Sequence, residues 1–381
     1  MTIPASTTHE NTSNGIEQHF KPGRSIHDYA RSQINEGDTL LGERFLCRGG
    51  SLIVVAPSGL GKSTLSIQIA ILWSCGKPAF DIKPSKSLRV LIVQSEDDEG
   101  DCIEMAVMMD HLDLKPAEIE LVRKNTELIH CNSLTRSKFV GALSQRLQLA
   151  IDCRDPFDLA IINPYSNYLG GDVADTELNL EFLHELLNPV LEKFKIAAIP
   201  ICHSPKTPYM NFNKFNPWDF QYAAAGCAAI ANWTRSMLVV IPIKDQEKLF
   251  KFVAAKRGAR IGVAWEGKLE RYFQHSTVPG LLRWEPASQE QKKSVQREKT
   301  KQKKNHTTHE VVLKCLDLIE WKNKAQFRIA AKNLLDIGIN AADDHLDAAV
   351  HESLIEIQER PRPRTSAEKF YRRNGLSSNG N

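Results

Sequence analysis

Short apolar runs alternate with helix-like segments between residues 25 and 285. Their length suits strands that are buried on both faces of a sheet, and the segments between them have the spacing of helices. The runs fall at residues 52–55, 88–93, 159–162, 196–201, 237–243 and 249–254. Strands that alternate with helices are typical of βαβ units, so the pattern predicts an α/β fold with a mostly parallel, twisted sheet.

The pattern changes at residues 286–306, which contain the stretch QKKSVQREKTKQKK. Seven basic residues lie between Lys292 and Lys304, and Glu290 and Glu298 are the acids of this stretch. Such a run of like charges stays in contact with water. We therefore expect a basic linker or a helical extension between the α/β core and the C-terminal residues.

Residues 307–381 have a pattern of their own. Helix-like segments at 310–321, 327–336 and 341–353 are followed by a short apolar run and the basic sequence RPRPR, which together predict a hairpin. Three helices and a hairpin suggest a small winged-helix-like module with a basic tail. A helical cap without a specific function fits the same pattern equally well.

Composition adds few constraints. The 381-residue chain has a formal net charge of +3, so any attraction to nucleic acid must be local. Its eight cysteines form no CxxC pair, which argues against a disulfide framework and against a zinc site. Residues 1–24 are polar, predict disorder and lack an apolar signal core, and no apolar run approaches the ~20 residues of a membrane helix. We expect a cytoplasmic protein without a membrane contact.

The sequence APSGLGKST comes directly after the first strand-like run and predicts a phosphate-binding loop. The loop comprises Ala56, Pro57, Ser58, Gly59, Leu60, Gly61, Lys62, Ser63 and Thr64. Its backbone N–H groups and the N-terminus of the next helix attract phosphate oxygens. Lys62 is expected to reach the β- and γ-phosphates, and the Ser63 hydroxyl to bind Mg²⁺. The motif therefore predicts that the protein binds ATP and Mg²⁺.

Two further strand ends bear on hydrolysis. Glu96 is the first acid after the second run, where a carboxylate can align the attacking water; a solvated acidic loop is the alternative. Asn163 directly follows the third run, where an aspartate would hold the water shell of Mg²⁺. Because a neutral amide lacks the attraction of a carboxylate for the metal, Asn163 puts efficient hydrolysis in question.

An ordered set of motifs resembles one family over residues 25–270. The motifs are APSGLGKST, VLIVQSEDD, LAIINPYSNYLGGD, IAAIPICHSPK, GCAAIANWTR and AAKRGAR. They resemble the RecA-like, AAA-type P-loop ATPases of plasmids and phages, a group that includes the hexameric plasmid replicative helicase RepA. The resemblance implies a RecA-like core that assembles as a ring, a hexamer in that helicase, with ATP between subunits.

The resemblance also assigns roles to single residues. Glu96 matches the catalytic glutamate, and His203 matches the strand-end histidine that senses the γ-phosphate. Arg235 matches an arginine that reaches the nucleotide of the neighbouring subunit, and Arg257 lies in a basic pair that faces the same way. Asn163 takes the place of the aspartate of the second acidic motif.

Two functions remain open at this stage. The first is an ATP-driven motor on DNA, a ring helicase or helicase-like ATPase that serves replication of a mobile element. The second is a nucleotide-gated module that binds DNA or protein and hydrolyses ATP weakly or not at all. In the first case the partners are further copies of the chain, single-stranded DNA and replication or mobile-element proteins. Residues 207–221, with five aromatic residues and Lys214, could stack on single-stranded DNA or pack on a neighbouring subunit.

Overall fold

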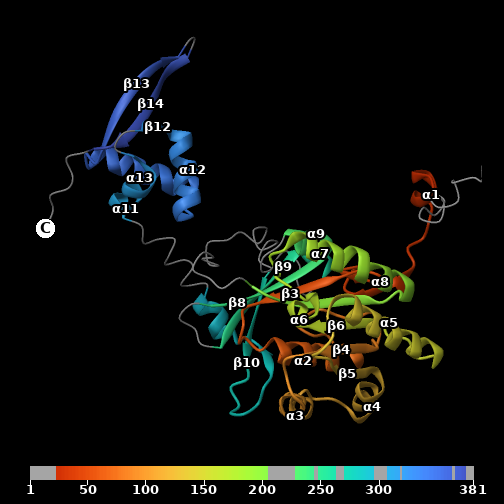
Figure 1. Ribbon diagram of the computed structural model, residues 1–381. Helices are drawn as coiled ribbons and strands as arrows, with labels where there is room; N and C mark the ends of the chain where they lie inside the picture. The colour runs from red at the N-terminus through yellow and green to blue at the C-terminus, as the bar shows by residue number, and fades with distance from the viewer. Residues whose placement is uncertain are drawn as a thin grey trace, which may run out of the picture.

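A computed structural model describes residues 23–204, 228–243, 248–262, 270–295, 307–317, 320–362 and 365–374. Nine of the described strands form one sheet, in the order β11-β10-β9-β8-β3-β7-β6-β4-β5 (Figure 1). Its parallel strands are β3 (Leu52–Ala56), β4 (Val90–Gln94), β5 (Thr126–His130), β6 (Leu159–Asn163), β7 (Ala197–His203) and β8 (Ser236–Pro242). The expected α/β fold with a mostly parallel sheet is confirmed.

Three antiparallel strands extend the sheet beyond β8. They are β9 (Leu249–Lys256), β10 (Glu270–His275) and β11 (Trp284–Pro286). The sequence pattern predicted β9, but β10 and β11 were missed, as was the parallel edge strand β5. A separate pair of short strands, β1 (Thr39–Leu41) and β2 (Leu46–Cys47), precedes the sheet in the chain.

Helices cover both faces of the sheet, because alternate residues of each strand point to opposite faces. In β3, Leu52 and Val54 belong to one core cluster, whereas Ile53 and Val55 belong to the other. The first face packs against α2 (Lys62–Ser74), α3 (Glu99–Ala106) and α4 (Pro116–Asn125). The second packs against α5 (Arg136–Asp152), α6 (Tyr165–Leu169), the π-helical turn η4 (Glu181–Leu187), α8 (Asn188–Phe194) and α9 (Ala228–Trp233). Figure 1 shows α3 and α4 on one side of the sheet and α8 and α9 on the other.

The shorter helices lie around these layers. They are α1 (Ile26–Ala30), η2 (Glu36–Asp38), η3 (Val107–His111), α7 (Thr176–Leu180) and η7 (Gly258–Arg260). No helix in the described residues is long and apolar enough to cross a membrane.

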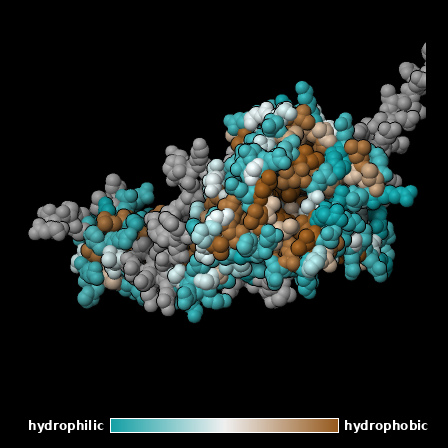
Figure 2. All heavy atoms as spheres, turned by 90° about the horizontal axis from the view of Figure 1, so that it is seen from below, coloured by the Kyte–Doolittle hydropathy of each residue, from teal (hydrophilic) through white to brown (hydrophobic). Residues whose placement is uncertain are grey.

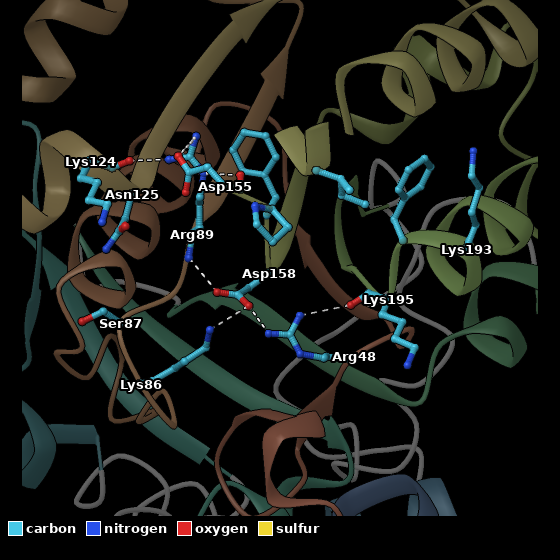
Figure 3. A pocket seen from close by; sticks show the side chains of 14 residues that line it. Arg48, Lys86, Ser87, Arg89, Lys124, Asn125, Asp155, Asp158, Lys193 and Lys195 are labelled. Carbon is cyan, nitrogen blue, oxygen red and sulfur yellow. Dashed lines mark hydrogen bonds and ion pairs between the residues drawn. The ribbon is translucent and has the colours of Figure 1, made fainter. Parts of the chain in front are cut away.

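A buried carboxylate ties together the amino-terminal edge of the parallel strands. Asp158 precedes β6, is 4% exposed and pairs with both Arg48 and Lys86 (Figure 3). It also accepts a hydrogen bond of 2.9 Å from the backbone N–H of Arg89, which precedes β4. Arg48 in turn donates to the carbonyl oxygen of Lys195, at 3.3 Å. These contacts surround a hollow of about 680 Å³, on the edge of the sheet opposite to the phosphate loop.

The C-terminal residues fold around a separate apolar core. The elements are α11 (Thr308–Cys315), β12 (Lys322–Asn323), α12 (Lys324–Leu335), α13 (Ile339–His351), β13 (Ile355–Arg362) and β14 (Thr365–Arg373). Their sheet has the order β12-β14-β13, and their core joins buried residues from Val311 to Tyr371. Three helices and a hairpin agree with the expected elements. The interpretation as a winged-helix-like module stays a prediction.

The packing of the core continues into the segment expected as a linker. Val295 is buried and packs with Leu249 of β9 and with Ala287, beyond the boundary expected at residue 285. Residues 296–306, the rest of the expected linker, lie outside the described part of the chain, as do residues 1–22.

Candidate functional site

The phosphate loop connects β3 to α2 and has the backbone that its sequence predicts. Gly59 and Gly61 adopt φ values of 73° and 80°, in the left-handed region that favours glycine. At Gly61 space is also limited, because an added Cβ would lie 3.3 Å from Nε2 of His275. The helix α2 begins at Lys62, so its first N–H groups face the loop.

Lys62 is buried beneath this loop. Its Nζ donates a hydrogen bond of 3.0 Å to the carbonyl oxygen of Pro57. Burial lowers the pKa of Lys62, and the carboxylates of Glu96 and Asp97 act in the opposite direction. These two carboxylates are therefore close enough to influence the lysine.

The two residues expected to hold Mg²⁺ are in contact. Nδ2 of Asn163 donates a hydrogen bond of 3.1 Å to Oγ of Ser63. Asn163 is 3% exposed, at the carboxyl end of β6, next to Gln94 at the end of β4. Both groups are neutral, and Mg²⁺ sites in proteins commonly combine one or two carboxylates with phosphates of the substrate and water. The pair fits a place in the water shell of Mg²⁺ but supplies no charge to it. Among the described residues, no group of three His, Cys, Asp or Glu side chains could hold a metal by itself.

Glu96 and His203 lie at the same edge of the sheet. His203 ends β7 and pairs in register with Ala56, the first residue of the loop. Burial lowers the pKa of His203, the charge of Lys62 lowers it further, and the carboxylate of Glu96 raises it. The structure thus brings together three residues that the sequence predicted to act together, and Glu96 remains exposed.

Comparisons with known proteins agree with this geometry. Residues 22–208 match a family described as "AAA domain". With the phosphate loop and the mostly parallel sheet, the match shows a RecA-like α/β fold.

Two solved structures are similar to this chain at low sequence identity. A RadB recombinase is similar at 16% sequence identity and a TM-score of 0.39, over 60% of this chain and 88% of that one. A KaiC-like protein from the hyperthermophilic archaeon Pyrococcus horikoshii is similar at 13% identity and a TM-score of 0.40, over 67% of this chain and 99% of that one. A search of curated proteins found no match.

The two predicted arginines lie at the edge of the sheet opposite to the phosphate loop. Arg235 directly precedes β8, which starts level with β3 because Ser236 pairs with Leu52. Arg257 follows β9, whose last residue, Lys256, pairs with Met237 of β8. Five strand residues span about 16 Å, so neither arginine is placed to complete the phosphate site of its own chain.

Two further arginines join them, and sequence reasoning missed both. Burial lowers the pKa of Arg257, and the charges of Arg235, Arg260 and Arg44 lower it further. The carbonyl oxygen of Arg260 accepts a hydrogen bond of 2.7 Å from the N–H of Glu43, which brings the loop of Arg44 to this place. None of the four forms an ion pair with another described residue. We call Arg44, Arg235, Arg257 and Arg260 the arginine cluster.

Strands β10 and β11 contact the phosphate loop and the helix that follows it, which the sequence did not indicate. Gln68 of α2 bonds to both backbone groups of Trp284: Nε2 donates to the carbonyl oxygen and Oε1 accepts from the N–H, each at 2.8 Å. Nε1 of Trp284 donates to the carbonyl oxygen of Gly61 at 3.2 Å. Nε2 of His275 lies 3.3 Å from the carbonyl oxygen of Leu60. The phosphate loop thus contacts residues more than 200 positions beyond it.

Some predicted features lie outside the described residues. They are the loop at residues 207–221 and Lys214 within it. Their proposed contacts with DNA or a neighbouring subunit stay predictions.

Proposed function

We propose that the protein is an ATP- and Mg²⁺-dependent ring ATPase that acts on DNA, a replicative helicase or helicase-like motor of a mobile element. One observation carries this proposal: the phosphate loop, Glu96 and His203 lie at one edge of the sheet, and the arginine cluster lies at the other. A single chain therefore has two halves of a phosphoryl-transfer site that cannot meet. A second copy can bring them together.

The residues at the phosphate edge have distinct tasks in this proposal. The loop from Ala56 to Thr64 holds the phosphates through its N–H groups, and Lys62 adds a positive charge. Glu96, exposed beside Lys62, aligns the attacking water and accepts its proton. His203 senses the terminal phosphate. Ser63 and Asn163 would hold the water shell of Mg²⁺, and the metal would neutralise charge on the phosphates.

The arginine cluster supplies the reason for assembly. Four like charges at one place raise the free energy of the folded chain unless an anion binds there, and a nucleotide phosphate is a suitable anion. A guanidinium delivered by a neighbour stabilises the charge that develops during phosphoryl transfer. Contacts of one edge with the opposite edge of the next copy are head-to-tail, and such contacts close into rings when the rotation allows.

The surface of the core agrees with self-association. Seen from below, apolar residues reach the surface in a band between hydrophilic ones (Figure 2). Exposed apolar side chains on the layer of α3 and α4 include Ile103, at 62% exposure, Val107 and Ile119. Apolar surface of this kind marks sites of protein contact when it is contiguous.

The second candidate is a nucleotide-gated module with little hydrolysis. It is favoured by Asn163, which contributes an amide and no charge beside Ser63. Both candidates bind ATP at the same loop, so turnover separates them. A motor hydrolyses ATP faster with single-stranded DNA, whereas a gated module binds ATP without appreciable turnover under either condition.

Mixed rings test the shared site. We expect Glu96→Gln to bind ATP but lose about 10²–10⁴-fold in turnover, as is usual for a positioned acid–base group. Arg235→Ala should also bind ATP and turn over slowly. In a mixture of equal amounts, about a quarter of the interfaces join an intact Glu96 to an intact Arg235, since each subunit is placed independently. ATPase activity should therefore recover to a measurable fraction of that of the unmutated protein.

Two controls bracket this experiment. Arg123→Ala removes an exposed arginine of α4, far in the chain from the cluster, and should leave turnover unchanged. Lys62→Ala should abolish ATP binding, because the loop loses its positive charge. Mixed rings without recovery would refute the shared site, and unchanged ATP affinity in Lys62→Ala would refute the nucleotide site itself.

A further inference from the structure

The magnesium side of the proposed site lacks a negative charge at the expected position. Asn163 ends β6 with an amide, and its Nδ2 donates to the Ser63 hydroxyl. Protein sites for Mg²⁺ that also use substrate phosphates commonly contain one or two carboxylates. Because all parallel strands end at the same edge of the sheet, a neighbouring strand can supply a carboxylate instead.

One carboxylate oxygen near this edge has no partner among the described residues. Oδ2 of Asp97 is buried and makes no hydrogen bond with any residue that the structure describes. Buried polar atoms are almost always hydrogen-bonded, and a buried carboxylate oxygen without a partner is costly. This oxygen is therefore a candidate to meet a cation or a water molecule bound to one.

The neighbouring acids do not share this property. Glu96 and Asp98 are exposed. Asp98 caps helix α3, where its Oδ1 accepts from the N–H of Asp101 at 2.8 Å and Oδ2 of Asp101 accepts from its own N–H at 3.0 Å. The inference thus concerns one oxygen atom and not the acidic run as a whole.

Asp97 follows β4, which lies between β6 and β5 in the sheet, so its backbone lies close to the carboxyl ends of both neighbouring strands. The N–H of Ser95 donates to the carbonyl oxygen of Asn163 at 3.2 Å, and Gln94 pairs with Asn163 in register. Two residues beyond Ser95, the chain can have advanced by at most about 7 Å. The carbonyl oxygen of Asp97 lies 3.2 Å from Nδ1 of His130, which ends β5. The negative charge of Asp97 also acts on Lys62, so the carboxylate lies within electrostatic reach of the phosphate loop.

We infer that Asp97 supplies the carboxylate of the magnesium side of the nucleotide site, in place of the residue that ends β6. The ligand is a hydrated divalent cation bound together with the phosphates of ATP. Ser63 and Asn163 are the neutral members of the same group. This inference rests on the proposed function, because it requires that the loop binds ATP.

The test compares ATP affinity with and without the metal. Binding of a fluorescent ATP analogue to the full-length protein is measured in Mg²⁺ and in EDTA. The dissociation constant in EDTA divided by that in Mg²⁺ gives the metal dependence. Asp97→Asn keeps the shape of the side chain and removes its charge. We expect the ratio to fall about 10- to 100-fold, the usual effect of losing an outer-shell partner of a metal. Affinity in EDTA should stay within about twofold, which also reports that the loop is folded.

Two further variants decide between charge and structure. Asp98→Asn makes the same charge change one residue away, and asparagine caps a helix as well as aspartate does, so the ratio should not change. In Asp97→Asn/Asn163→Asp the carboxylate is returned to β6, and the ratio should recover. Mn²⁺ titrations followed by electron paramagnetic resonance should show the same loss and recovery of metal binding in the presence of ATP.

The outcomes separate this inference from the proposed function. An unchanged ratio in Asp97→Asn, an equal fall in Asp98→Asn, or no recovery in the double variant would overturn the role of Asp97 while leaving ATP binding intact. Failure of the unmutated protein to bind ATP, or unchanged affinity after Lys62→Ala, would overturn the proposed function instead.

Discussion

The contact between Gln68 and Trp284 gives a sharp test of how the phosphate loop is held. Gln68 lies on α2, directly after the loop, yet only 5% of it is exposed. Its amide bonds to both backbone groups of Trp284, which is itself 2% exposed. In Gln68→Met the side chain keeps its length but loses both hydrogen bonds.

The size of the stability loss in Gln68→Met depends on the backbone groups of Trp284 that are left without hydrogen-bond partners. A buried backbone N–H or C=O without a hydrogen bond costs about 1–3 kcal/mol, so the two at Trp284 together cost about 2–6 kcal/mol. Methionine is easier to bury than an amide, which offsets part of this loss. We therefore expect the free energy of unfolding of the core to fall by about 2–4 kcal/mol. Affinity for ATP should fall as well, since Trp284 also donates to Gly61 of the loop.

Urea unfolding monitored by tryptophan fluorescence measures this change. Five of the six tryptophans precede residue 290, so fluorescence reports chiefly on the core and not on the C-terminal residues, which have a core of their own. Gln145→Met on the exposed side of α5 is the matched control and should change stability by less than about 0.5 kcal/mol. A fall in Gln68→Met no larger than in this control would refute the view that β10 and β11 fix the phosphate loop.

Two further predictions concern the C-terminal residues. Truncation after Val295 keeps the packing of the core. If the removed residues bind DNA, DNA affinity should fall, and the slope of log affinity against log salt concentration should become shallower by about 0.9 for each lost contact with a duplex phosphate, or by about 0.7 for each contact with a single strand. Equal slopes with and without these residues would mean that the core alone binds DNA. Arg328, and after it Lys324, lowers the pKa of Asp343 from 3.8 to about 2, so this pair stabilises the fold above about pH 4 and the contribution is lost as pH falls towards 2. Asp343→Asn should remove that acid dependence, as measured by circular dichroism between pH 2 and 5; an unchanged acid transition would show that other groups cause it.

The sequence predicted the strands whose faces are both buried. β3, β4 and β6 are buried at every position and read as continuous apolar runs. β5, with the sequence TELIH, is an edge strand of mostly half-buried residues and has no such run. β10, with the sequence ERYFQH, is likewise only partly buried and was missed. An apolar run reveals a strand only where both of its faces pack against helices.

The same limit applies to the site. Residues of the phosphate loop are contiguous, so a motif reveals them together. Gln68 and Trp284 are 216 positions apart, and nothing in either local sequence indicates that they bond. Arg44 joins the arginine cluster only because the backbone of Glu43 bonds to that of Arg260. Contacts of this kind depend on the packing of distant segments, which no local pattern reports.

A sequence motif assigns the carboxylate for Mg²⁺ to one position in the chain, whereas metal binding requires only that a carboxylate lies near the metal in space. At Asn163 the two differ, because the expected position holds an amide, and a carboxylate oxygen without a partner among the described residues lies after the adjacent strand, at Asp97. Strand ends at one edge of a parallel sheet are close in space, so a charge lost from one strand can be supplied by its neighbour without a change of fold. Absence of an aspartate from β6 is therefore weak evidence against hydrolysis in this chain. The stronger evidence will come from the charge at Asp97 and from the arginine cluster of a second copy.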